Sequence, residues 1–111
     1  MFDFSRRKFF TSLAALPLAA VFSRPAKAAT THTVRIQGFA FQPSNISIAK
    51  GDTVKFKNND NAAHTADDRG KTWKTGKIRG SQSKEVTYDS AGSFDYFCRY
   101  HPAMKGKITV S

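Results

Sequence analysis

Apolar and polar residues alternate in short stretches along most of the chain from residue 33 onward. This period of two is typical of strands with one buried face, and turn-forming Gly, Pro, Asn and Asp residues separate the stretches. The expected strands cover residues 33–36, 46–48, 54–56, 86–88, 94–98 and 108–110. The pattern predicts an all-β domain of about six to seven short strands, most simply a sandwich of two sheets.

The segment from Asp67 to Ser83 interrupts this alternation because it is polar and carries only two large apolar residues, Trp73 and Ile78. We expect it to hold at most one short strand, at the edge of a sheet. Lysines at positions 71, 74 and 77 would keep such an edge from pairing with other chains.

The first 28 residues have the regions of an export signal. Arg6-Arg7 precedes an alanine-rich apolar run from Leu13 to Phe22, and this run is roughly half the length that a membrane-spanning helix needs. Ala26-Lys27-Ala28 supplies the small residues that a signal peptidase reads. We therefore expect a twin-arginine signal peptide over residues 1–28 that is cleaved near Ala28, and a mature periplasmic domain over residues 29–111 without a stable membrane anchor.

Charge and cysteine content narrow the class of protein further. The chain has 18 basic and 8 acidic residues; five of the basic residues and one acid precede residue 29, which leaves a net charge of +6. The basic residues are scattered and do not alternate with aromatic residues, which argues against a nucleic-acid partner. They indicate a solvated basic surface more than a specific site for a polyanion, and such a surface would steer the domain toward acidic proteins. A lone cysteine excludes an internal disulfide, so a metal is the candidate that would stabilise so small a domain.

Three metal-binding side chains fall within seven residues near the C-terminus: Cys98, His101 and Met104. A thiolate, an imidazole and a thioether form a soft donor set, which suits copper that cycles between Cu(I) and Cu(II). Cys98 ends a predicted strand, and a tight turn around Pro102 would aim the other two donors at its sulfur. His64, on a loop upstream, is available as a fourth donor from a facing loop.

The stretch from Tyr96 to Gly106, YFCRYHPAMKG, resembles the short ligand loop of the amicyanin-like cupredoxins, which are small blue copper proteins. Phe56-Lys57-Asn58-Asn59, upstream of His64, resembles the corresponding segment of plastocyanins. The resemblance implies a Greek-key β-sandwich that binds one type 1 copper ion. The ligands it implies are His64, Cys98, His101 and Met104.

Thr65 stands where this family usually has asparagine, directly after the first histidine ligand. In relatives the backbone amide at this position helps to hold the cysteine sulfur. Threonine keeps that amide, and we expect its hydroxyl to bond to the facing loop. The 33 residues between His64 and Cys98 are fewer than in plastocyanins, so one edge strand is expected to be short or missing.

The donor set and the resemblance together favour a periplasmic carrier of single electrons. The expected partners are acidic redox proteins such as a c-type cytochrome or an exported dehydrogenase, and the domain is expected to act as a monomer. Copper storage or delivery is the alternative, although the chain lacks the exposed tracts rich in methionine and histidine that such proteins use. An enzyme is not expected, because three histidines cannot build a second multi-histidine copper site.

Overall fold

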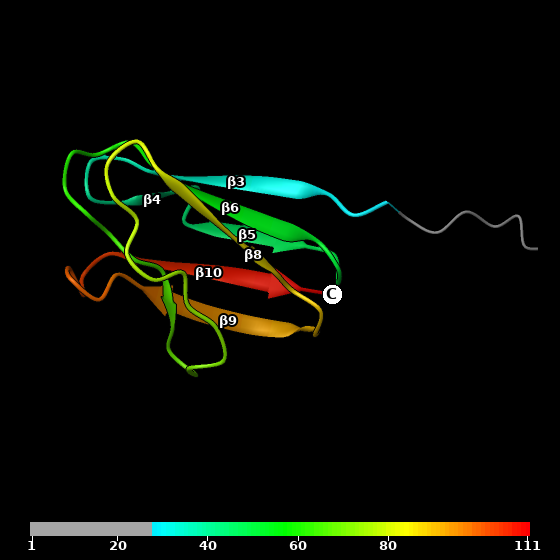
Figure 1. Ribbon diagram of the computed structural model, residues 1–111. Coiled ribbons are helices and arrows are strands. Elements are labelled where there is room, and N and C mark those ends of the chain that lie inside the picture. Colours follow the sequence, from blue (N-terminus) through cyan, green and yellow to red (C-terminus); the bar gives the residue numbers. More distant parts are fainter. Residues whose placement is uncertain (1–27) are drawn as a thin grey trace, which may run out of the picture.

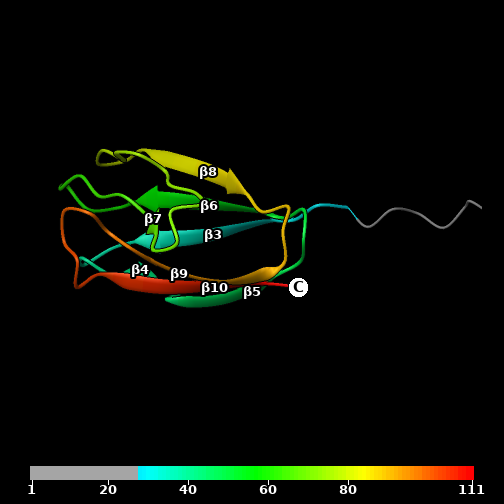
Figure 2. The ribbon, with the colours of Figure 1, turned by 90° about the horizontal axis from the view of Figure 1, so that it is seen from below.

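The computed structural model describes residues 28–111, which form two four-stranded sheets stacked face to face (Figures 1 and 2). The sheets have the strand orders β4-β3-β6-β8 and β5-β10-β9-β7. The strands are β3 (Thr31–Ile36), β4 (Phe41–Gln42), β5 (Asn45–Ile48), β6 (Thr53–Asn58), β7 (Asp67–Asp68), β8 (Ser83–Thr87), β9 (Gly92–Phe97) and β10 (Lys105–Val110). Within residues 28–111 no helix has the length and apolarity that crossing a bilayer requires.

The predicted all-β sandwich is confirmed, and each predicted strand is present with bounds that differ by a few residues. The expected short edge strand is β7, which has two residues and pairs with the end of β9. β4 was not predicted, because two residues are too few to display an alternation. The predicted signal peptide falls on residues 1–27, which the structure does not describe, and on residue 28; it stays a prediction.

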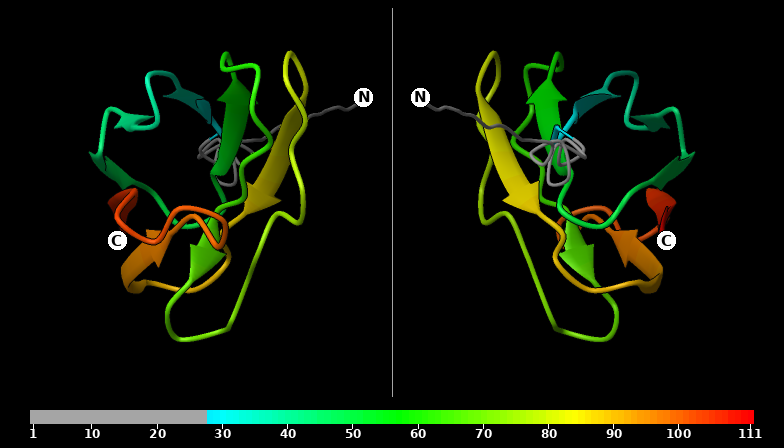
Figure 3. Two further views of the ribbon diagram at one scale, coloured as in Figure 1. Left: turned by 90° about the vertical axis from the view of Figure 1, so that its left-hand side faces the viewer. Right: turned by 90° about the vertical axis from the view of Figure 1, so that its right-hand side faces the viewer.

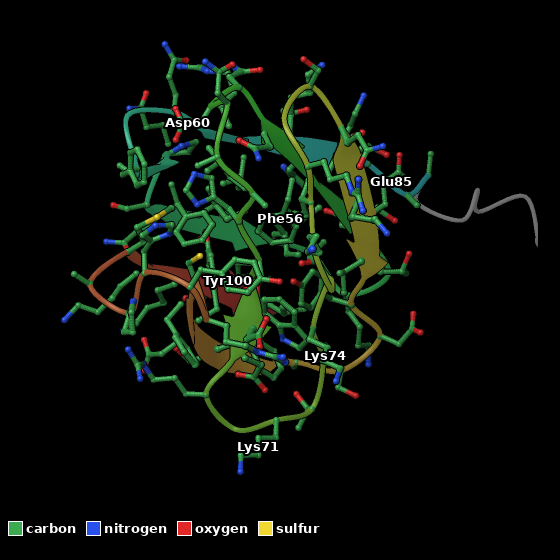
Figure 4. The ribbon with its side chains drawn as sticks, turned by 60° about the vertical axis from the view of Figure 1, so that its left-hand side comes forward. Phe56, Asp60, Lys71, Lys74, Glu85 and Tyr100 are labelled. Carbon is green, nitrogen blue, oxygen red and sulfur yellow. The ribbon has the colours of Figure 1, made fainter. Side chains whose placement is uncertain are left out.

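Side chains that alternate on facing strands fill the space between the sheets. Along β10 the even-numbered residues from 106 to 110 are buried and the odd-numbered ones are exposed, as the sequence pattern requires. An aromatic cluster lies at the centre: the ring centroids of Phe41 and Phe56 lie 4.7 and 5.6 Å from that of Tyr96. Figure 4 shows Phe56 near the middle of the molecule. Burying each large apolar side chain contributes roughly 1.5–3 kcal/mol to folding.

Tyr96 requires glycine on the neighbouring strand. Gly106 of β10 lies directly opposite Tyr96 of β9 in the antiparallel pair. A Cβ atom at position 106 would overlap the ring of Tyr96, so no other residue fits without a shift. Tyr96 and Cys98 are both buried and lie two residues apart, so this close approach is next to the candidate donor.

Three loops meet at one end of the sandwich, on the left in Figure 1 and facing the viewer in the left panel of Figure 3. They are the β3–β4 connection at residues 37–40, the β6–β7 connection at residues 59–66, and the β9–β10 connection at residues 98–104. The C-terminus lies at the opposite end. The predicted donors are all in the second and third loops, so the fold brings two distant parts of the chain to one place.

Candidate metal centre

His64 is fully buried and is fixed through both its backbone and its ring. Its backbone amide and carbonyl pair with the carbonyl and amide of Ile78, at 3.0 and 2.8 Å. Its Nε2 lies 2.9 Å from the carboxylate of Asp60, and its Nδ1 lies 3.7 Å from Sγ of Cys98. In the tautomer whose Nε2–H donates to the carboxylate of Asp60, Nδ1 presents its lone pair toward the sulfur.

A chain of backbone hydrogen bonds folds residues 98–104 into a tight loop. The amide of Cys98 donates a hydrogen bond of 3.1 Å to the carbonyl of Met104. The amide of His101 donates to the carbonyl of Cys98 at 3.2 Å, and the amide of Met104 donates to the carbonyl of His101 at 2.8 Å. Nδ1 of His101 consequently lies 3.8 Å from Sγ of Cys98. Met104 is buried on the same loop. The loop therefore ties all three C-terminal candidates to one another.

The thiolate and imidazole donors have the spacing of ligands around one ion. Sγ of Cys98 and one ring nitrogen from each of His64 and His101 lie within 4.8 Å of one another. Bonds of about 2.3 Å to sulfur and about 2.0 Å to nitrogen, as at zinc, separate the two donors by about 3.7 Å at a trigonal angle. The observed separations of 3.7 and 3.8 Å match that value. The residues present thus fit a trigonal metal site.

Thr65 connects the two loops that carry these donors. Its amide approaches Sγ of Cys98 at 3.4 Å, and its hydroxyl accepts a hydrogen bond of 2.8 Å from the amide of Arg99. Both contacts expected from the sequence are confirmed. The amide thus provides the sulfur with a hydrogen-bond donor from the facing loop and helps to fix its position.

Asp60 was not predicted as part of the site. Its carboxylate accepts hydrogen bonds from the amides of Gly38 and Phe39, at 2.8 and 2.9 Å, in addition to its contact with His64. Burial raises the pKa of Asp60, but the amides of Phe39 and Gly38, together with His64, outweigh that effect and hold the pKa below its usual range. The only sequence signal was a carboxylate four residues before a histidine.

The third histidine, His32, takes no part in this cluster. Its Nε2 lies 2.9 Å from the carboxylate of Asp52. The hydrogen bond to His32 and those from the amides of Thr30 and Ala49 lower the pKa of Asp52 to about 2. The contact between His32 and Asp52 connects strand β3 to the turn before β6. The histidines at the candidate centre are therefore His64 and His101.

Comparisons with known proteins agree on one family. A family model described as a cupredoxin-like domain matches residues 11–110. Amicyanin-alpha of Methylorubrum extorquens is 28% identical over 106 residues, which cover 91% of this chain and 89% of that protein. Plastocyanin of Daucus carota is 31% identical over 84 residues, which cover 64% of this chain and 87% of that protein. The solved structure of an oxidized amicyanin mutant has a TM-score of 0.69 at 26% identity, over 80% of this chain and 88% of that one.

Proposed function

The chain belongs to the cupredoxin-like family, and from this premise and the donor geometry we propose that it is a type 1 copper protein that carries single electrons between exported redox proteins. The observation that carries the proposal is the convergence of Sγ of Cys98 with Nδ1 of His64 and of His101, at 3.7 and 3.8 Å. A thiolate with two imidazoles is the donor set of blue copper sites.

Each candidate ligand has a distinct role in this proposal. His64, Cys98 and His101 would hold the ion through their imidazoles and thiolate, and the thioether of Met104 would be a weaker fourth ligand. When bound, copper supplies a one-electron couple between Cu(I) and Cu(II). The hydrogen bonds within residues 98–104, with those of Thr65, fix the donors in the protein alone, and they would do so whichever oxidation state the ion has. Little rearrangement then accompanies the gain or loss of an electron.

The difference in exposure between the two imidazoles suggests where electrons enter and leave. His64 is fully buried, whereas His101 is partly exposed and the two residues after it, Pro102 and Ala103, are exposed. Among the thiolate and imidazole donors, only His101 therefore reaches the surface. We assign electron exchange to its outer edge, with Pro102 and Ala103 as a small apolar contact area.

The partners are acidic redox proteins, for which a c-type cytochrome and an exported dehydrogenase are the candidates. Basic side chains support this: a hollow of about 640 Å³ beside β7 is lined in part by four basic residues and two acids, which leaves it net positive. The basic residues are Arg69, Lys71, Lys74 and Arg99, and the acids are Asp67 and Asp68. Such a surface attracts acidic partners and raises the rate of encounter. The proposal includes export to the periplasm by the predicted twin-arginine signal, and action as a monomer.

Copper storage or delivery is the alternative, and the buried donors argue against it. Proteins that hand over copper need ligands that leave readily, whereas both Cys98 and His64 are fully buried and hydrogen-bonded in place. A copper enzyme would need an open position or a second metal centre. His32 cannot contribute to a second centre with the other histidines, since it is paired with Asp52 outside the cluster.

The test is the spectrum of the purified protein with one equivalent of Cu(II). We expect an intense visible band from sulfur-to-copper charge transfer, a type 1 electron paramagnetic resonance signal and a reversible one-electron potential. Cys98→Ser should abolish the strong colour, while His32→Ala, the matched control at the remaining histidine, should keep it. A wild-type spectrum without the charge-transfer band would refute the proposal. Rapid loss of Cu(I) to a weak chelator would favour delivery instead.

A further inference from the structure

The connection between β3 and β4 carries an aromatic residue to the donor cluster in an unusual backbone conformation. Phe39 has a φ of 56°, and Gly38 before it has a φ of 63°. A bulky residue rarely adopts this left-handed conformation, which costs free energy unless contacts compensate. The ring is also half exposed: Phe39 and Tyr100 are the exposed large hydrophobic residues of the described part of the chain.

The contacts of Phe39 are with the two imidazoles of the candidate centre. Its ring centroid lies 5.1 Å from that of His64 and 4.9 Å from that of His101, and its plane is nearly perpendicular to both, at 87° and 88°. The two imidazole centroids are themselves 5.1 Å apart. The three rings thus form a nearly equilateral triangle, in the edge-to-face arrangement that aromatic pairs prefer.

Asp60 links the backbone of this connection to the ring of His64. One carboxylate binds the amides of Gly38 and Phe39 and also Nε2 of His64, all within 2.9 Å. The position of Asp60 is itself fixed, because its amide donates to the side chain of Asn58, which is fully buried and bonded to the carbonyls of Ala62 and Ile78. Phe39 and His64 are therefore held to the same rigid group.

We propose that Phe39 is a positioning residue of the metal centre: held by Asp60, its ring covers both imidazoles, keeps water away from them and holds His101 turned toward Cys98. His101 depends on this cover more than His64 does, because His64 is already buried and fixed by Asp60. The consequence for copper retention rests on the proposed function. The protection of the imidazoles does not, since it is a property of the protein alone.

The first test uses the metal-free full-length protein and Phe39→Ala. Diethylpyrocarbonate modifies accessible, unprotonated histidines, and peptide mass spectrometry reports the rate at each one. Removing the ring should increase the rate at His101 about tenfold and leave the rate at His32 unchanged within the same molecule. Tyr100→Ala, which removes the other exposed aromatic residue, should change the rate at His101 less than twofold. Equal rates at His101 in wild type and Phe39→Ala would overturn the proposal.

The second test uses the copper-loaded protein. Loss of an outer contact to a metal ligand typically costs 10–100-fold in metal affinity, so Phe39→Ala should lose Cu(I) to a chelator about tenfold faster than wild type. Asp60→Asn should act in the same direction, and Phe39→Leu, which keeps an apolar cover, should fall between Phe39→Ala and wild type. If wild type lacks the charge-transfer band, the proposed function fails while the modification test still decides the role of Phe39. In a protein that shows the band, unchanged Cu(I) loss in Phe39→Ala would refute the positioning of the metal ligands by this residue.

Discussion

The hydroxyl of Thr65 is the group whose removal best tests how the two donor loops are joined. Thr65→Val nearly keeps the size and shape of the side chain but deletes the hydroxyl oxygen. That oxygen accepts a hydrogen bond of 2.8 Å from the backbone amide of Arg99. Thr65 is almost fully buried, so water cannot easily replace the lost acceptor. Leaving a buried donor unsatisfied costs about 1–3 kcal/mol. Since Arg99 is itself at the surface, we expect the lower half of that range, about 1–2 kcal/mol.

For a domain of this size each kcal/mol shifts the midpoint of thermal unfolding by about 4–8 °C, so Thr65→Val should melt about 4–16 °C below wild type in the metal-free form. Thermal unfolding followed by circular dichroism measures this shift. Thr65→Ser is the matched control: it keeps the hydroxyl, loses one methyl group, and should cost only about 1 kcal/mol through lost apolar burial. A Thr65→Val protein that melts with wild type would show that the bond between the loops contributes nothing to stability.

Three further outcomes follow from other parts of the molecule. Gly106→Ala should lower the free energy of unfolding by about 1–3 kcal/mol in a denaturant titration, because the new methyl group displaces the ring of Tyr96; no loss would contradict the close approach of the two strands. The pKa of Asp52 is lowered to about 2 in the folded state, so its stabilising contribution is complete above its ordinary value of 3.8 and disappears as pH falls from there toward 2. Melting temperatures of wild type and Asp52→Asn should converge over that interval, and a constant difference would exclude the contribution. The rate of reduction by an acidic redox partner should fall as salt is added, and a rate that stays flat from low to physiological ionic strength would exclude steering by the basic surface.

The fold was predictable where strands are long and have one buried face. In β6 and β10 every second residue is buried, and that alternation is visible in the sequence. β7 gave no such signal, because its two residues are aspartates that lie buried despite their charge. The structure explains this with specific partners: Asp67 pairs with Arg99 at 3.2 Å, and Asp68 accepts hydrogen bonds from the amide and hydroxyl of Thr72. These partners come from loops, which composition alone cannot position.

The donor residues were predictable because their chemistry is rare and their spacing short. A single cysteine with histidine and methionine at intervals of three indicates a metal site without any knowledge of the fold. The residues that support the donors carry no such signal. In the sequence, Asp60 has the pattern of a turn residue and Phe39 that of an ordinary apolar residue. They contact His64 and each other because the β3–β4 connection lies against the β6–β7 loop. Supporting contacts of this kind depend on topology.

The arrangement of supports explains how a site with one partly exposed ligand can still keep its geometry. His64 is held by Asp60 and by an isolated backbone bridge to Ile78, while His101 sits on a loop of seven residues that bonds mainly to itself. A loop so short has few alternative conformations. Within residues 28–111, however, no carboxylate forms a hydrogen bond with the ring of His101, in contrast to His64. The ring of Phe39 touches His101 from a third loop that is anchored to the same Asp60. If His101 binds the metal as proposed, the exposed ligand gains its orientation from the anchor of the buried one, and electron exchange at the surface would not require a loosely held metal.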